Sequence, residues 1–151
     1  MRKAYICQTL RAELPGYDSI TAALARNGSW WDSFRQKTRA ISQAEAAEPL
    51  LLFAAHAYTS KNPAELAMLA VAYGRSLGKN HALLSLVDKF IMADSTFVAT
   101  LEGMDCLVLL AKTYTDIGQP RRAWLMWRHG LAVAQLMVCR CLFHIISSDD
   151  I

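Results

Sequence analysis

The sequence predicts an all-α domain, a multi-helical array of packed αα-hairpins with about six or seven helices. Apolar residues recur every three or four positions over most of the chain, which is the spacing of one helix face. No stretch of useful length alternates apolar and polar residues in the way that a strand does. No proline interrupts the chain between Pro63 and Pro120, so long helices can form between them.

Short apolar repeats place the helices of the first third of the chain. Residues 1–16 give no clear pattern, and Leu14-Pro15-Gly16 is expected to close this segment as a turn. A helix is then predicted over residues 19–26, and a second from Gly28-Ser29 to about residue 41. A third is predicted over residues 44–59, although Pro49 leaves its start open.

Capping signals define the next two helices. Asn62 suits the N-cap, Pro63 the first turn, and Glu65 the positive end of a helix. This helix is expected to end near Gly78. Asn80 is then expected to cap a shorter helix.

The segment from Thr100 to Met137 predicts a helical hairpin. Gly118 is expected to end the first helix, and Pro120 fits the first turn of the second. The second helix is expected to pack on the first through one face, in which Trp127 is buried. The residues of this face are Trp124, Trp127, Leu131 and Ala134, and Trp127 is expected to meet Leu107, Leu110 and Tyr114.

The hairpin also carries an order of large, small and aromatic residues similar to one tetratricopeptide unit. In such a unit small residues let two helices cross closely and aromatic side chains fill the remaining space. No second copy is visible at an offset of about 34 residues, so an array of repeats is not expected. The residues concerned are Leu107, Leu110, Ala111, Tyr114, Ala123, Trp127 and Gly130.

Several short motifs stand out along the chain. They are Leu-Glu-Gly at residues 101–103, Gly-Gln-Pro-Arg-Arg-Ala-Trp at 118–124 and Gly-Leu-x-x-Ala-Gln at 130–135, with weaker stretches at 27–35 and 58–66. Together they resemble the fungal-specific transcription factor domain. The resemblance covers roughly residues 14–137.

That domain is the regulatory middle homology region, which follows a six-cysteine binuclear zinc cluster in many fungal transcription regulators. The resemblance implies a nuclear location, control of genes transcribed by RNA polymerase II, and contacts with protein partners or with missing parts of a longer chain. The chain carries no such cluster, so sequence-specific DNA binding is not expected of it. The alternative function is a tetratricopeptide-like scaffold that binds a protein partner and has no role in transcription.

The composition favours a piece of a larger helical protein. The chain is 54% hydrophobic and only 19% charged, which is unusual for a free-standing domain. A core rich in Ala and Leu would account for this composition. An exposed apolar surface made for missing neighbours accounts for it better, because the resemblance also implies truncation.

The charge and hydropathy patterns give no sign of nucleic acid or membrane as a partner. The net charge of +3 is dispersed, and no basic run is longer than Arg121-Arg122. Apolar stretches such as residues 50–55 and 107–111 are too short to span a membrane. No signal peptide is evident, because polar residues end the apolar stretch near the N-terminus too early.

No catalytic, cofactor-binding or metal-ligating residue is predicted, and the chain is not expected to be an enzyme. Glu102 and Asp105 could mimic an acid pair, but carboxylates early in a helix are more simply explained by the helix dipole. Cys139, Cys141 and His144 could supply three zinc ligands, but a fourth is not evident.

Two further side-chain roles are predicted within the hairpin. Cys106 is expected to be a small buried hydrophobic residue. Arg121 and Arg122 are expected to lay their stems across Trp124 or a neighbouring helix and to pair with acids such as Asp116.

The two ends of the chain are expected to differ from residues 14–137. Residues 1–13 form an uncertain N-terminal segment. Residues 138–151 are predicted to be foreign to the fold, because the family-like pattern stops at Met137. Val138-Cys139 can be encoded by GTATGT, which resembles the start of a fungal intron, so a retained intron or a truncated gene product would explain the tail. The alternative is a genuine short helix that covers the end of the hairpin. The tail's apolar residues without a predicted partner surface are Leu142, Phe143, Ile145 and Ile146.

Overall fold

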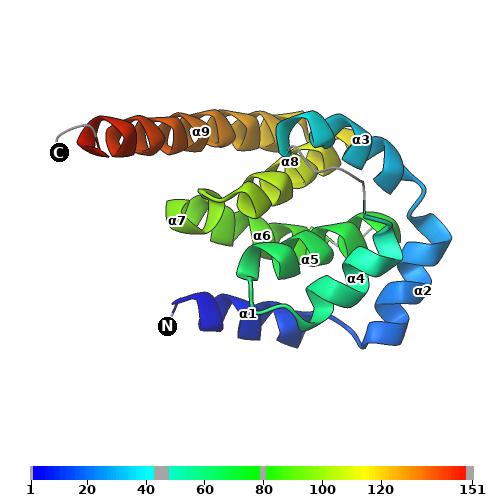
Figure 1. The fold of residues 1–151 in the computed structure, drawn as a ribbon. Helices are drawn as coiled ribbons and strands as arrows, with labels where there is room; N and C mark the ends of the chain where they lie inside the picture. The colour runs from blue at the N-terminus through cyan, green and yellow to red at the C-terminus, as the bar shows by residue number, and fades with distance from the viewer. Residues whose placement is uncertain (1, 43–47, 79–80, 149–151) are drawn as a thin grey trace.

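The computed structural model describes residues 2–42, 48–78 and 81–148, and these residues form nine helices and no strand (Figure 1). The all-α class is therefore confirmed, and the predicted number of six or seven helices is too low. Eight of the nine have at least seven residues. The helices are α1 (Arg2–Glu13), α2 (Tyr17–Asn27), α3 (Trp30–Ser42), α4 (Leu50–Thr59), α5 (Pro63–Leu77), α6 (His81–Ala93), α7 (Ser95–Val98), α8 (Leu101–Asp116) and α9 (Pro120–Ser148).

Helix α1 occupies the segment for which no clear pattern was found. Ile6 and Leu10 are its buried residues, and the helix packs on α5 and α6. Arg11 Nη2 donates to the carbonyl oxygen of Ser60 at 2.7 Å, which fixes α1 to the end of α4. Because only two positions of the helix are fully buried, its apolar periodicity is too short to read from the sequence.

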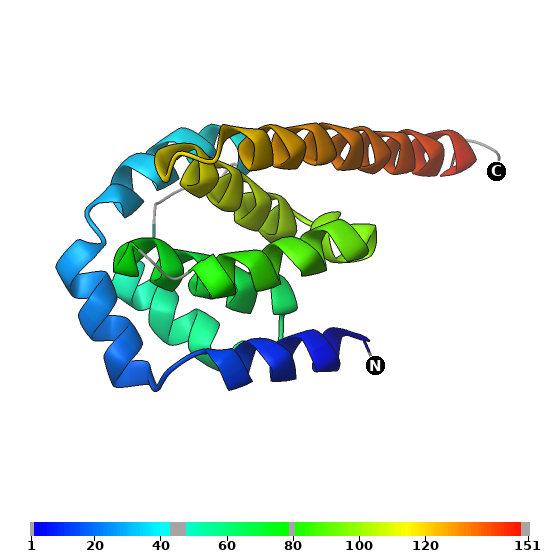
Figure 2. The same ribbon diagram turned by 180° about the vertical axis from the view of Figure 1, so that it is seen from behind.

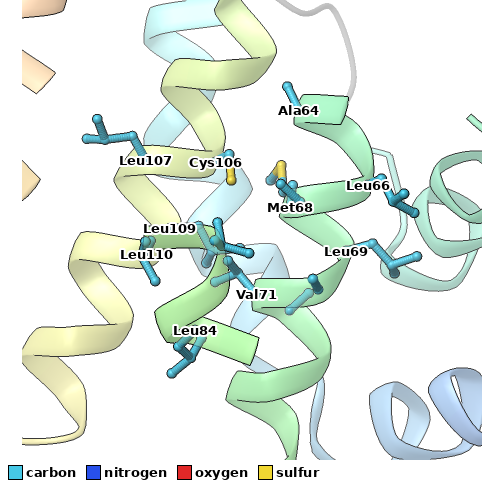
Figure 3. Close-up of a cluster of buried hydrophobic side chains, with 14 of the residues drawn as sticks. Ala64, Leu66, Met68, Leu69, Val71, Leu84, Cys106, Leu107, Leu109 and Leu110 are labelled. Carbon is cyan, nitrogen blue, oxygen red and sulfur yellow. The ribbon is translucent and has the colours of Figure 1, made fainter. Parts of the chain in front are cut away.

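Helix α5 lies at the centre of the core. The Ala64 N–H donates to Asn62 Oδ1 at 3.0 Å, and Gly78 ends the helix with a φ of +72°, so both predicted ends are confirmed. Helices α1, α2, α4, α6, α7 and α8 all pack on α5. Figure 3 shows Met68 of α5 and Cys106 of α8 pointing toward each other across this core.

The other predicted elements of the first two thirds agree with the structure where it describes them. Helices α2 and α3 match the predicted helices at 19–26 and from Gly28-Ser29 to about residue 41. Helix α4 begins at Leu50, directly after Pro49. The predicted start at residue 44 and the predicted cap at Asn80 lie outside the described residues.

Helices α8 and α9 form the predicted hairpin. The Gly103 N–H donates to Thr100 Oγ1 at 3.0 Å at the start of α8. Gly118 has a φ of +79° in the connection, and Pro120 is the first residue of α9. Figure 2 shows α8 running beneath the first part of α9.

The predicted packing face of α9 is wrong. Trp124, Trp127 and Leu131 are 57%, 42% and 68% exposed, so Trp127 is not buried against α8. The residues of α9 that are buried are Ala123, Met126, Gly130 and Val133.

The small residues explain this orientation. A Cβ atom on Gly130 would lie 2.8 Å from Leu107 Cδ2, so the two helices approach closely at this position. The Leu107 side chain fills the space beside Gly130, so a larger residue has no room there, and this packing holds the Gly130 side of α9 against α8. Of the seven residues in the tetratricopeptide-like pattern, only Trp127 is not buried.

The tail continues α9 rather than forming a separate helix. The helix passes through Met137 without a break and ends at Ser148. Side chains 138–147 are all exposed, as expected of a tail without a partner surface. In Figures 1 and 2 this part of α9 projects beyond α7 and α8. The foreign origin of residues 138–151 stays a prediction.

Candidate interaction surface on helix α9

Helix α9 concentrates the exposed apolar side chains of the molecule. Among the described residues, ten of the seventeen exposed large hydrophobic side chains belong to this one helix. Contiguous exposed apolar surface of this kind marks an interaction site in a folded protein. The ten are Trp124, Leu125, Trp127, Leu131, Leu136, Val138, Leu142, Phe143, Ile145 and Ile146.

The helix is also long and apolar enough to cross a membrane, judged by length and composition alone. An 18-residue window within Pro120–Ser147 has a mean hydropathy of 1.6, and 11% of the window is buried. The prediction that no segment reaches spanning length was therefore wrong for this helix, because it counted only unbroken apolar stretches. Arg140 is the one Lys or Arg between residues 130 and 147, and it leaves the mean hydropathy of the window high.

A groove of about 390 Å³ lies between α7 and α9. Its α7 side offers the small polar residues Ser95 and Thr96, and its α9 side offers mainly apolar and sulfur-containing side chains. The α9 residues that line it are Leu136, Met137, Cys139, Arg140, Phe143 and His144.

A second groove, of about 510 Å³, lies where α3 and α8 approach α9. Trp127 lines it together with Phe34, Val108 and two lysines, Lys37 and Lys112. Trp127 therefore lines this groove, whereas the prediction placed it in the core. Helix α3 therefore occupies the space beside α9 at the level of Trp127.

Glu102 and Asp105, which were predicted to be carboxylates held by the helix dipole rather than an acid pair, have different surroundings in the structure. Arg35 Nη1 lies 3.0 Å from Asp105 Oδ2, while the Glu102 side chain is exposed. Burial raises the pKa of the Asp105 carboxyl above its usual range, although the guanidinium of Arg35 acts in the opposite direction. The cavity beside Asp105 measures only about 70 Å³. His56 and Glu65 also line it, and His56 Nε2 lies 3.7 Å from Glu65 Oε2.

The predicted partners of Arg121 and Arg122 are wrong. Asp116 instead accepts from Arg75 Nη2 at 2.6 Å and from Lys112 Nζ at 3.3 Å. Burial acts to raise the pKa of Asp116, but these two cations outweigh it and hold the pKa below its usual range. Arg121 is exposed.

Two arginines of α9 lie over aromatic rings. The guanidinium of Arg122 lies 5.6 Å from the ring centre of Tyr114, and that of Arg128 lies 5.4 Å from the ring centre of Trp124. Arg122 therefore helps to hold α9 on α8. The side chain that covers Trp124 is that of Arg128, one helical turn after Trp124, and not that of Arg121 or Arg122.

The four cysteines lie on three helices, α1, α8 and α9. Cys106 is fully buried, as predicted, and burial raises the pKa of its thiol. Cys139 and Cys141 are exposed on α9. Among the residues that the structure describes, no three His, Cys, Asp or Glu side chains are grouped so that they could hold a metal ion.

The scan against family models and the searches of curated proteins and of solved structures each find no match to this chain.

Among the described residues, the arrangement therefore offers an exposed apolar helix surface flanked by two grooves. An exposed apolar helix flanked by two grooves suits recognition of another helix or of an extended peptide. Sequence reasoning predicted exposed apolar residues in the tail, but it did not join them to the apolar residues before Met137, because it treated Met137 as a boundary. The regular apolar spacing that crosses this residue was the signal that could have found this surface.

Proposed function

We propose that this chain is a regulatory, protein-interaction domain similar to the fungal-specific transcription factor domain, acting in the nucleus without a DNA-binding module of its own. The resemblance of residues 101–103, 118–124 and 130–135 supports the transcriptional part of the proposal. The exposed apolar surface of α9 supports the part that concerns protein contacts.

The projecting end of α9 carries the proposal. Helices shorter than about 12–15 residues are marginal in water when nothing packs on them. Residues 138–148 are helical although side chains 138–147 are exposed. A partner that covered this segment would stabilise its helical form and remove its apolar side chains from water. We propose no catalytic role for the small polar cavity, where Arg35 is paired with Asp105 and His56 lies next to Glu65.

The alternative function is a tetratricopeptide-like scaffold that binds a protein partner outside transcription. The observation that favours it is the packing of the hairpin, in which small residues of α9 are buried against α8. Ala123 and Gly130 are both buried there, as they would be in such a unit.

A reporter assay in a fungal host tests the proposed function. The chain is fused to an unrelated DNA-binding domain, and the expression of a reporter gene is measured with and without the fusion. We expect wild-type chain to change reporter expression and Leu142→Glu to reduce that change, because this exposed leucine lies on the proposed surface.

The matched control is Leu52→Glu, which introduces the same charge at an exposed leucine of α4. It should leave the reporter response as in wild type. A wild-type fusion that reaches the nucleus and leaves the reporter unchanged would contradict the transcriptional role and favour the scaffold.

A further inference from the structure

Seven apolar residues of α9 follow the alternating three- and four-residue spacing of a coiled-coil seam. This spacing places its members on one narrow stripe along a helix, to which a second helix can pack. The stripe passes the junction between Met137 and Val138 without a change of spacing. We call it the seam, and its residues are Trp124, Trp127, Leu131, Ala134, Val138, Cys141 and Ile145.

The seam is a different face from the one that packs on α8. Leu131, Val138 and Ile145 are 68%, 58% and 61% exposed, and Cys141 is also exposed. Ala134 is half-buried. The second half of the seam is thus an apolar helix stripe that no element of this chain covers within the described residues.

We propose that the seam pairs with the seam of a second copy of this chain, with the two α9 helices antiparallel. The inference rests on the proposed function, because it names the partner of the same surface. In antiparallel pairing Val138 of each copy meets Cys141 of the other, and Ala134 of each meets Ile145 of the other. The small Ala134 then faces the large Ile145 at each end of the pair, so the seam is complementary to itself.

The position of α3 selects the antiparallel direction. Phe34, Lys37 and Thr38 of α3 line the groove with Trp127, so α3 stands beside the seam at its N-terminal end. Parallel helices would bring both copies of α3, and with them both domains, to the same end of the pair, where each α3 stands beside the partner's α9. Antiparallel helices overlap through the projecting ends, and the two domains then lie at opposite ends of the pair.

Charge and area are compatible with a reversible dimer. The seam positions from Leu131 to Ile145 carry no charged side chain, and their neighbours Gln135 and Leu142 are uncharged. From the exposed fractions, the pair would bury on the order of 900 Å² in total, which is in the range of weak, transient interfaces. A lipid occupant is disfavoured, because Arg140 lies in the middle of the projecting end and would enter the hydrocarbon.

Sedimentation equilibrium over a range of protein concentrations tests the pairing. We expect the wild-type chain to pass from monomer to dimer at micromolar concentration, and Val138→Glu to shift the midpoint at least tenfold higher. Phe143→Glu is the matched control, because Phe143 is 75% exposed on the same part of α9 but lies outside the seam. Circular dichroism confirms that both variants are folded.

Cysteine cross-linking tests the direction. In a chain with Cys7, Cys139 and Cys141 replaced by Ser, treatment with diamide should link two copies when Ala134→Cys and Ile145→Cys are combined. Ala134→Cys alone should not link them, because the two identical positions lie about 11 helical residues apart, roughly 16 Å. Linked dimers from Ala134→Cys alone would show parallel helices and overturn the proposed arrangement.

Co-sedimentation with vesicles of phosphatidylcholine and phosphatidylserine separates a membrane surface from a second copy. Binding that Val138→Glu and Phe143→Glu weaken equally, together with a monomer at all concentrations, would overturn the proposal. A monomer that also changes reporter expression would refute pairing and leave the proposed function standing. A dimer that leaves reporter expression unchanged would support pairing and contradict the proposed function.

Discussion

Arg35 Nη1 and Asp105 Oδ2 are 3.0 Å apart, and this ion pair joins α3 to α8 where few other contacts do so. The carboxyl group is largely withdrawn from water, and burial raises its pKa in spite of the arginine. Asp116, at the other end of α8, has a lowered pKa because Arg75 and Lys112 both donate to it, although burial acts against them. Two aspartates of one helix therefore depend on pH in opposite ways.

The first prediction is this opposite pH dependence. In the folded protein Asp105 takes up a proton at a higher pH than in the unfolded chain. Wild type should therefore gain stability relative to Asp105→Asn as the pH falls toward 3.8, the ordinary value for the carboxyl. Asp116 stabilises the fold above its ordinary pKa, so its advantage over Asp116→Asn should shrink as the pH falls through the lowered pKa.

Urea unfolding at a series of pH values measures both differences. A difference between wild type and Asp105→Asn that does not change with pH would mean that the carboxyl is solvated in the folded protein.

The second prediction concerns Gly103 at the start of α8. A Cβ atom there would lie 2.5 Å from the carbonyl oxygen of Phe97 and 2.7 Å from that of Val98. Because backbone atoms cannot move aside easily, Gly103→Ala should lower the free energy of unfolding by about 1–3 kcal/mol. The control is Gly16→Ala, where nothing lies within 4 Å, and its effect should stay below about 1 kcal/mol, the size of a change at the N-cap of α2. Equal effects of the two substitutions would contradict the tight α7–α8 connection.

The third prediction compares neighbours on α9. Met126 is 2% exposed against α8, while Trp127 is 42% exposed. Met126→Ala should cost about 2–5 kcal/mol, because it leaves a cavity in the core. Trp127→Ala should cost clearly less, although tryptophan is the larger side chain. Chemical denaturation measures both, and the reverse order would show that α9 is rotated so that the tryptophans face the core.

The fourth prediction concerns the cap of α5. The Ala64 N–H donates to Asn62 Oδ1 at 3.0 Å at the start of the most buried helix. Asn62→Ala should lower the free energy of unfolding by about 1 kcal/mol, because a helix-end donor loses its partner. Asn62→Asp replaces the amide oxygen at the cap with a carboxylate oxygen, which can accept the same hydrogen bond. Its stability should therefore be close to the wild-type value. Thermal unfolding of the three proteins provides the comparison.

The fifth prediction is that the chain does not bind DNA with sequence specificity. Its net charge is only +3, and its sequence has no six-cysteine cluster. Any binding should be weak, indifferent to sequence and strongly reduced by salt. Fluorescence anisotropy with one duplex and scrambled competitors at physiological salt checks this. Retention of one duplex over the competitors would refute the expectation.

Local signals predicted the fold where they are strong and independent of packing. The cap at Asn62 and the left-handed glycines at 78 and 118 depend only on a few neighbouring residues, so helix ends near them could be placed from the sequence. The cap at Thr100 depends on equally local residues, but it was not predicted. Helix α1 could not be predicted from the sequence, because its two buried residues are explained only by packing on α5 and α6. Helix α7, with four residues, is too short for a periodic pattern.

The orientation of α9 could not be predicted, because its apolar residues surround most of the helix. Size alone favoured the tryptophans as the buried face. The close approach at Gly130 decides otherwise, and this approach depends on the three-dimensional path of α8. The ion pair of Arg35 with Asp105 was missed for a related reason, since 70 positions separate the two residues in sequence.

The two parts of α9 should differ in how fast their amide hydrogens exchange with solvent. Around Val133 the helix is held by α8, so its amides exchange only when the hairpin opens. Beyond Val138 each amide depends on fraying of the end of α9, where helix–coil exchange takes place within microseconds. Exchange rates should therefore rise steeply toward Ser148 in a monomer. Any partner that covers this end would slow the exchange of its amides selectively, whatever its chemical identity.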